Sequence, residues 1–163
     1  MPTILSHPAV PLALHVGLGQ RVVSSRLLAV SVVCSILPDL DVLAFQMGIP
    51  YSSYLGHRGF THSIFFALVI AVICTAFYQQ LHTSSRAAFS VSFLSGVSHG
   101  FLDAFTNGGL GVAFLWPISD QRFFFPVQVI EVPPIGLSRF LRCYAWHVLV
   151  SEMIWIWLPC AIV

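Results

Sequence analysis

The sequence contains no lysine and few charged residues of either sign. Seven residues are basic, six are acidic, and together they make up 8% of the chain, where a soluble protein has roughly a quarter. Hydrophobic residues account for 57% of the 163 positions. So few charges cannot cover the surface of a 17.9 kDa globule, which excludes a soluble monomer. The composition indicates an integral membrane protein with a single domain over residues 1–163.

A basic surface, a cysteine framework and a cleavable leader are also missing. The net charge is +1, and scattered arginines do not form the basic stripe that nucleic-acid binding needs, so we expect no nucleic-acid partner. The four cysteines have no CxxC spacing and are expected to be small buried residues. The N-terminus lacks a basic region and a small-residue cleavage site, so the first apolar segment is expected to stay in the mature protein.

Three apolar stretches predict membrane-spanning helices. The clearest covers residues 59–85, which contain no Asp, Glu, Lys or Arg, and whose centre at 64–78 is almost wholly apolar. Residues 87–102 form a second stretch, and residues 143–163 form a third, which Glu152 interrupts.

The N-terminal part and the stretch before the last span are less regular. Residues 8–20 and 27–37 correspond to about 20 Å and 16 Å of helix, and they predict a helical hairpin whose second helix ends at Pro38. Residues 107–136 are rich in Gly and Pro and are expected to lie over one face of the bundle. The predicted fold is therefore all-α, an integral membrane bundle of four or five membrane-embedded helices.

Charged residues are costly inside a membrane, so those in the predicted membrane segments need a structural or functional explanation. The polar residues of these segments fall in four short strings. These strings are Ser6-His7, Pro38-Asp39-Leu40-Asp41, His57-Arg58-Gly59-Phe60-Thr61-His62-Ser63 and Ser98-His99-Gly100-Phe101-Leu102-Asp103. Because successive helices run in opposite directions, the hairpin and the next two helices bring all four strings to the same face of the bundle.

Histidines and carboxylates in this pattern indicate a metal centre. His99 and Asp103 are four residues apart and therefore project from one helix face. Asp39 and Asp41 follow Pro38 in a turn, with one residue between them. They would either bind two metal ions, or one would bind a metal ion while the other contacts a ligand of that ion. This nitrogen and oxygen set suits zinc, or manganese or iron. The ligand set would consist of three or four of the imidazoles His7, His57, His62 and His99 with two or three of the carboxylates Asp39, Asp41 and Asp103.

Two residues of these strings are expected to take part in catalysis. A metal ion lowers the pKa of bound water and supplies a hydroxide nucleophile. Asp39 or Asp41 would act as general base if it is not a ligand, and Arg58 is placed to meet an anionic substrate.

Other polar residues have simpler interpretations. Asp39 alone would cap a turn, and His7 lies close enough to the terminus to fray. Glu152 is expected either to contact a metal ligand, without binding the metal itself, or to form an ion pair with Arg139 or Arg142. Arg122 is expected to be an interface anchor, and three further histidines are expected to be packing residues: His15, His82 and His147.

The four strings resemble a bacterial family, the YdjM-like, LexA-regulated inner-membrane proteins classed as predicted membrane-bound metal-dependent hydrolases. The matching segments are LPDLD at 37–41, GHRGFTHS at 56–63, GVSHGFLD at 96–103 and LWP at 115–117. The resemblance implies a multi-pass protein of the bacterial cytoplasmic membrane. It also implies the same seven metal ligands, with Arg58 in the place of the family's arginine. The family's pattern is distantly similar to that of zinc-dependent phospholipase C and related nucleases.

The function expected from these observations is metal-dependent hydrolysis, with a phosphoester of a lipid or lipid-linked molecule as substrate. One alternative is a metal or solute transporter that uses the same residues, although the chain has no inverted repeat. Another is a non-enzymatic protein whose metal only holds the helices together. In an enzyme, Arg58→Gln should abolish turnover while metal and folding persist, whereas a structural metal would tolerate Lys or Gln there.

Overall fold

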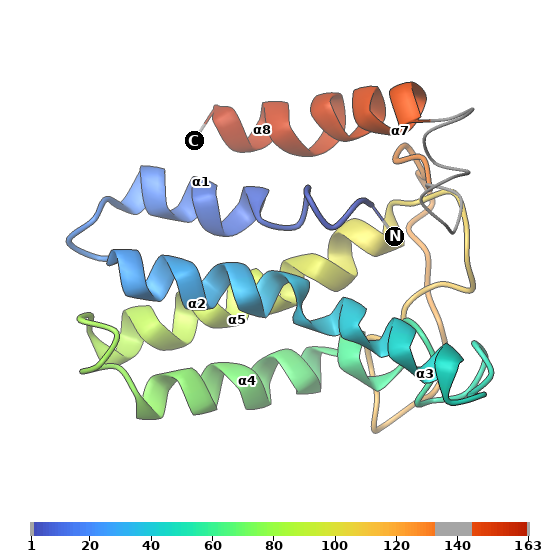
Figure 1. The fold of residues 1–163 in the computed structure, drawn as a ribbon, viewed down its shortest axis with the longest axis horizontal. Coiled ribbons are helices and arrows are strands. Elements are labelled where there is room, and N and C mark those ends of the chain that lie inside the picture. Colours follow the sequence, from blue (N-terminus) through green and yellow to red (C-terminus); the bar gives the residue numbers. More distant parts are fainter. Residues whose placement is uncertain (1, 133–144, 163) are drawn as a thin grey trace.

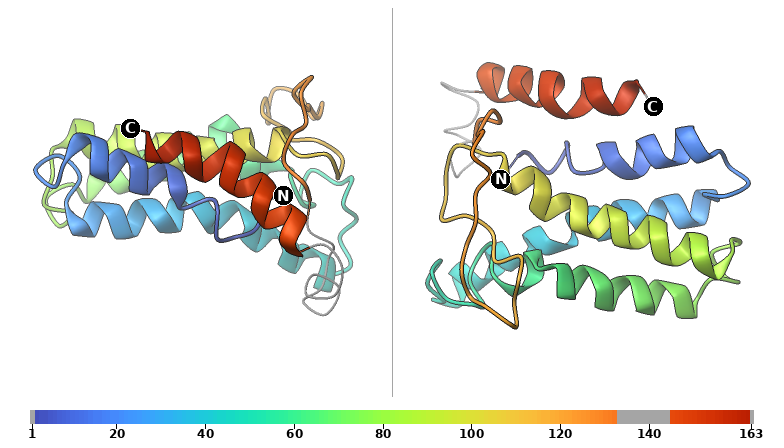
Figure 2. Two further views of the ribbon diagram at one scale, coloured as in Figure 1. Left: turned by 90° about the horizontal axis from the view of Figure 1, so that it is seen from above. Right: turned by 180° about the vertical axis from the view of Figure 1, so that it is seen from behind.

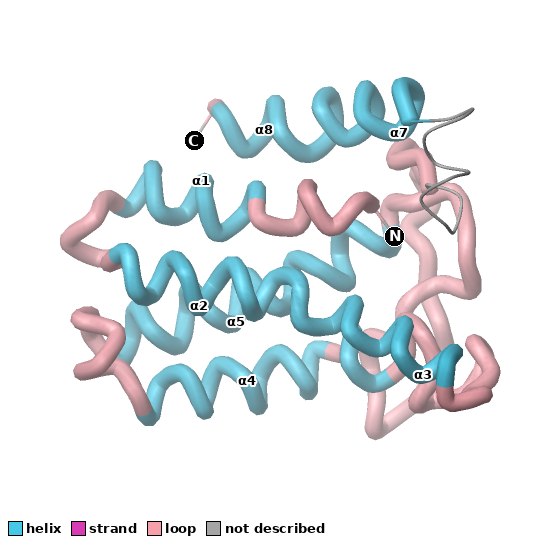
Figure 3. Tube along the Cα trace, in the orientation of Figure 1, coloured by secondary structure: helices cyan, strands magenta, loops and turns pink. Residues whose placement is uncertain are grey.

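A computed structural model describes residues 2–132 and 145–162, and helices form its whole framework (Figures 1 and 3). Within these ranges there is no strand, and the only β-type pairing is two isolated bridges, Thr106 with Ile130 and Val112 with Phe123. The all-α prediction is therefore confirmed for the described residues.

Five helical rods run in alternating directions. They are α1 (Ala9–Leu18), α2 (Ser25–Ile36) with its extension, α4 (Ile64–Ala76), α5 (Ser85–Ala104) and a C-terminal rod. The α2 rod continues through a 3₁₀ turn (Leu37–Val42) into α3 (Leu43–Gln46). The C-terminal rod consists of α7 (Ala145–Glu152), a π-helical turn (Met153–Trp157) and α8 (Leu158–Ala161).

Serine caps fix where three of these helices begin. The side chains of Ser24, Ser63 and Ser84 each accept a hydrogen bond from the backbone N–H three residues later, at the starts of α2, α4 and α5. Such caps satisfy backbone groups that the first turn leaves unpaired. Since His62 directly precedes the Ser63 cap, the start of α4 also fixes the place of this histidine.

The central helix α5 packs against both α2 and α4, and the C-terminal rod lies beside α1 (Figures 1 and 2). Small and medium side chains such as Leu27, Cys74, Ala88 and Val91 form the apolar core between these helices. The Sγ atoms of Cys34 and Cys74 are 3.9 Å apart as free thiols. These two cysteines are buried as expected, Cys160 is half-buried, and Cys143 lies outside the described residues.

The α-helix α2 ends at Ile36, beside the boundary expected at Pro38. The helical run nevertheless continues from Ser25 to Gln46, and it is the one helix in the described ranges that is long and apolar enough to cross a membrane. Pro38 lies at the first positions of the 3₁₀ turn, where the α-helical pattern stops because proline has no N–H to donate.

The expectation of several full membrane spans needs a further correction. In place of the span expected at 59–85, α4 has 13 residues and counts, with Ala9–Leu18 and Trp146–Ala161, among the shorter apolar helices. The α5 helix has 20 residues, but Ser92, Ser95, His99 and Asp103 on it are all buried. These four polar side chains therefore point into the bundle, and they lower the hydropathy of the helix without being exposed on its surface.

The Gly/Pro-rich stretch covers one end of the bundle. Its described part, up to residue 132, is the long connection beyond the C-terminal end of α5 in Figure 1. Backbone hydrogen bonds tie this connection to the helix end, such as the one from Phe125 N–H to Ala104 C=O. The predicted residues 133–136, and the start of the predicted third span, lie outside the described residues.

Candidate metal centre

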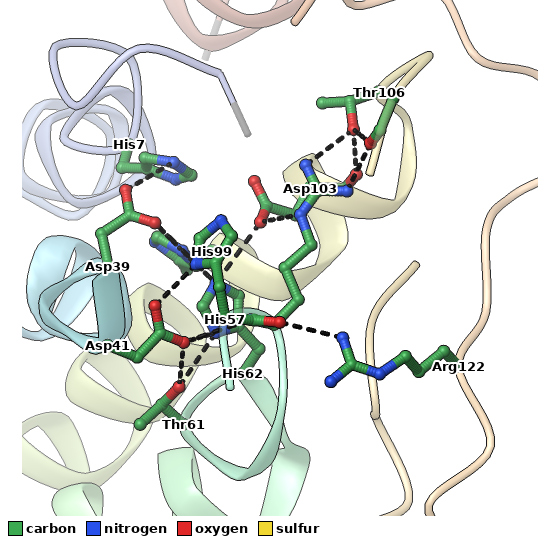
Figure 4. A network of polar contacts seen from close by, with 12 residues as sticks. His7, Asp39, Asp41, His57, Thr61, His62, His99, Asp103, Thr106 and Arg122 are labelled. Carbon is green, nitrogen blue, oxygen red and sulfur yellow. Dashed lines mark hydrogen bonds and ion pairs between the residues drawn. The ribbon is translucent and has the colours of Figure 1, made fainter. Parts of the chain in front are cut away.

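The structure brings candidate ligands from four segments of the chain together (Figure 4). His7 precedes α1, Asp39 lies in the 3₁₀ turn after α2, His62 lies just before α4, and His99 and Asp103 lie one turn apart on α5. None of the five side chains belongs to a residue more than 4% exposed. The convergence expected from the alternating helix directions is therefore present in the fold.

Four of these residues are spaced as ligands of one ion would be. The Nε2 atoms of His62 and His99 are 3.0 Å apart. Asp39 Oδ1 lies 3.3 Å from His99 Nε2 and 3.8 Å from His62 Nε2, and Asp103 Oδ2 lies 3.4 Å from His62 Nε2. Metal bonds of about 2.0–2.1 Å in a tetrahedron place neighbouring ligand atoms about 3.3 Å apart. The four side chains can therefore hold one metal ion.

The hydrogen bonds of the two imidazoles leave their Nε2 lone pairs for a cation. His99 Nδ1 donates to the Ser35 carbonyl at 2.7 Å, and His62 Nδ1 faces Asp41 Oδ2 at 3.2 Å. Because both Nδ1 atoms meet acceptors, they carry the hydrogens, as inferred from these partners. Two Nε2 lone pairs facing each other at 3.0 Å would repel unless a proton or a metal ion lies between them.

Several atoms of the cluster have no hydrogen-bond partner among the described residues. They include both carboxylate oxygens of Asp39, both of Asp103 and both ring nitrogens of His7. Burying a charged carboxylate without compensation costs on the order of several kcal/mol. A divalent cation at the centre of the cluster would remove this cost, so the unmatched atoms fit a metal better than an empty core.

The cluster attracts positive charge. Burial by itself would lower the pKa of His62, but hydrogen bonds and charges from Asp103 and Asp41 outweigh it and raise the pKa to about 9. The same carboxylates would favour a metal cation, which must displace the proton to bind.

His7 adds a fifth potential ligand beside these four. Its ring stacks on that of His99 with centroids 3.8 Å apart and an interplanar angle of 18°. Its Nε2 lies 3.7 Å from Asp39 Oδ2. An ion bound to His99 and Asp39 would therefore lie within reach of His7.

Asp41 and His57 lie behind these ligands and form, with His62, a second group whose ligand atoms are close enough together to hold a metal ion. Asp41 Oδ1 is 2.6 Å from His57 Nδ1, which is a hydrogen-bond distance and shorter than the spacing of two ligands on one ion. Asp41 Oδ2 also accepts from Thr61 Oγ1 at 2.7 Å and from the Arg58 N–H at 3.2 Å. These contacts support the alternative in which Asp39 binds the metal and Asp41 orients His62.

Replacing Asp41 by asparagine is expected to weaken metal binding by about 10- to 100-fold, the usual effect of removing a carboxylate that orients a histidine ligand. An amide would offer His62 only one acceptor and would lose the charge that favours this ring orientation. Competition titration with a chelator measures the affinity. Asp120→Asn, at an exposed carboxylate, is the matched control and should bind as tightly as the wild type.

Arg58 forms an ion pair with Asp103, one of the four candidate ligands. It is 0% exposed, and its Nε lies 3.0 Å from Asp103 Oδ2. Its Nη1 donates to the Gly108 carbonyl at 2.8 Å and its Nη2 to Thr106 Oγ1 at 3.0 Å. Its backbone is in the left-handed region, with φ of 62°, which is uncommon outside glycine and is found at functional sites. These contacts hold Asp103 in place; contact with a substrate remains a prediction.

The other polar residues lie away from the centre. His15 Nδ1 bonds to the Val23 carbonyl at 2.8 Å, as a packing residue would. His82 and His147 are exposed, so the packing prediction is wrong for both; His82 lies in a turn with φ of 53°.

Arg122 donates to the carbonyls of His57, Tyr51 and Ser53, so it anchors the loop at residues 51–57. Arg139 and Arg142 lie outside the described residues.

Sequence reasoning missed three partners of the site. Thr61 lies inside the HRGFTHS string and could have been found there, since its hydroxyl is next to His62. Thr106 follows Asp103 by three residues, and its hydroxyl receives a hydrogen bond from Arg58. The Ser35 carbonyl has no sequence signal, because every residue carries a carbonyl.

Comparison with known proteins identifies the family of the chain. The sequence matches the family described as YdjM inner membrane protein over residues 1–163. The chain belongs to the YdjM family. This YdjM-family chain is 44% identical to inner membrane protein YbcI of Escherichia coli (strain K12) over 160 residues, which are 98% of the chain and 92% of that protein. No solved structure matches it.

Family membership confirms the resemblance found in the four strings and makes this an inner membrane protein. The buried His/Asp cluster of the YdjM-family chain lies in those same strings, at positions suited to hold a metal ion.

Proposed function

We propose that this YdjM-family protein is a membrane-bound metal-dependent hydrolase. The ion is held by Asp39, His62, His99 and Asp103, with His7 as a further ligand. The observation that carries the proposal is the pair of facing Nε2 atoms 3.0 Å apart between two buried carboxylates. Zinc suits two imidazoles and two carboxylates best, with manganese or iron as alternatives.

A divalent ion at this position supplies a bound water of lowered pKa, which is the chemistry that hydrolysis needs. The chain's own residues then divide the remaining work. Asp41 orients His62, and Arg58 holds Asp103 through the 3.0 Å ion pair. Of the two carboxylates expected as general base, Asp41 is occupied by hydrogen bonds, whereas the oxygens of Asp39 have no such partner among the described residues. Because Asp39 is a ligand in this proposal, it is not the base, and the base role stays with Asp41 as expected from the sequence.

The substrate we propose is a phosphoester in a lipid or lipid-linked molecule. Asp39 lies roughly 20 Å along the helix that begins at Ser25, about two thirds of the way along the 22-residue apolar helix Ser25–Gln46. Beside Asp39 is a cavity of about 270 Å³ whose other lining residues are all apolar: Ile4, Val33, Ile36, Leu37, Leu40 and Val42. A lipid chain fits such a cavity better than a water-soluble ester does.

Phosphoester hydrolysis is tested on the detergent-purified protein loaded with zinc or manganese. We expect release of phosphate or a headgroup from at least one member of a panel of phospholipids and lipid-linked phosphates. Release should require the metal and should be lost in His99→Ala. His15→Ala, a histidine hydrogen-bonded far from the cluster, should retain the activity. A metal-loaded protein that releases nothing across the panel would count against the hydrolase.

A structural metal is the second candidate, and the burial of the cluster favours it. All four ligands lie in residues that are at most 4% exposed, and structural zinc sites are closed and four-coordinate. In that case chelation should unfold the bundle, and no lipid should be turned over by the metal-loaded protein.

A further inference from the structure

Glu152 is a buried carboxylate on the C-terminal rod, outside the metal cluster. It is 1% exposed. It accepts hydrogen bonds from the backbone N–H of Thr3, from Thr3 Oγ1 at 2.6 Å and from Ser6 Oγ at 2.6 Å. These donors belong to the segment that precedes α1, so one carboxylate ties the two ends of the described chain together.

The π-helical turn brings a second side chain to the same place. Trp157 Nε1 donates to Ser6 Oγ at 3.2 Å, although Trp157 lies five residues beyond Glu152. In a regular α-helix two such residues would point about 140° apart. The turn Met153–Trp157 is π-helical, and its wider i→i+5 repeat brings residues five apart toward one face. Glu152 and Trp157 can therefore both hydrogen-bond to the Ser6 hydroxyl.

His7 follows Ser6 directly and has little else to fix it. Residues 4–8 form turns rather than a helix, held by backbone bonds from Ser6 N–H to Thr3 C=O and from Ala9 N–H to Ser6 C=O. The ring of His7 nevertheless stacks on His99 at 3.8 Å. In Figure 1 the segment runs from the N-terminus toward α1 beneath the C-terminal rod, where Glu152 can hold it.

We propose that Glu152, assisted by Trp157, is a positioning residue that holds His7 as a ligand of the metal. This inference rests on the proposed metal centre. A glutamate suits the task because its two oxygens accept three donors at once, whereas a glutamine would offer one acceptor oxygen and turn its NH₂ group toward the remaining donors. Burial of a charged carboxylate is costly, and these three hydrogen bonds offset that cost.

The test uses Co²⁺ as a spectroscopic probe in the full-length, detergent-purified protein. Affinity and visible absorption, which reports the number and geometry of cobalt ligands, are compared for the wild type, Glu152→Gln, His7→Ala and the double variant. We expect Glu152→Gln to lower cobalt affinity roughly tenfold and to shift the spectrum toward that of His7→Ala. In the His7→Ala background it should change affinity less than about twofold, because coupled residues are not additive.

Met153→Leu, at an exposed neighbour on the same rod, is the control and should leave affinity and spectrum unchanged. Hydrogen exchange of the metal-free protein gives a second readout: Glu152→Gln should speed exchange in residues 3–7 and leave residues 95–103 unchanged. The proposal is overturned if Glu152→Gln leaves cobalt binding as in the wild type, or lowers it equally with and without His7. A wild type that binds no cobalt would instead refute the metal centre itself.

Discussion

Replacing Arg58 by methionine is expected to destabilise the metal-free protein by about 3–5 kcal/mol. Arg58 is 0% exposed and so is Asp103, and their side chains meet at 3.0 Å. Methionine fills much of the space but leaves the buried Asp103 carboxylate without the guanidinium, so that His62, 3.4 Å away, is its remaining charged partner. Urea unfolding in a fixed detergent, followed by tryptophan fluorescence, measures the change.

Two further variants separate charge from shape in this prediction. Arg58→Lys keeps a cation but loses the forked contacts to Thr106 and Gly108, so its stability should fall between wild type and Arg58→Met. Adding Asp103→Asn to Arg58→Met removes the charge of that carboxylate and should restore part of the stability. An Arg58→Met protein as stable as the wild type would show that the pair does not hold this end of the bundle.

This expectation differs from the one drawn from sequence, in which Arg58→Gln leaves folding intact. The difference arises because sequence places Arg58 between two histidines but does not show that its guanidinium is buried against Asp103. Loss of activity in an Arg58 variant is therefore informative only where unfolding is measured alongside it.

Alanine at His99 or at His62 is expected to lower metal affinity by at least about 100-fold. Each supplies an Nε2 to the four-ligand set, and without it the two carboxylates, the other imidazole and His7 bind zinc far less tightly. Competition titration with a chromophoric chelator measures both variants. His82→Ala, at an exposed turn, should bind as the wild type does, and a His99→Ala protein with wild-type affinity would contradict the assigned ligand set.

Much of the site follows from sequence because helix direction is enough to place it. The strings at His7, Asp39, His62 and His99 sit at helix ends, and alternating directions bring those ends together whatever the detailed packing. The four-residue spacing of His99 and Asp103 likewise fixes one shared helix face. These arguments need neither side-chain rotamers nor exact helix lengths.

The remaining features depend on three-dimensional detail. Whether Asp41 binds a metal or orients a ligand depends on which ring nitrogen of His62 faces it, and spacing does not give this. The continuation of the helix through Pro38 depends on a local 3₁₀ turn. The role of Glu152 depends on contacts with Thr3 and Ser6, which lie 149 and 146 residues away in the chain. The sequence alone does not decide whether Glu152 acts on the metal site or pairs with an arginine.

The most direct test of the metal centre is the metal content per chain of the detergent-purified wild type, measured by elemental analysis after exposure to zinc, manganese and iron in turn. The account predicts one tightly held ion per chain, retained through gel filtration and absent from His62→Ala purified in the same way. A folded wild type that takes up none of the three metals would contradict it.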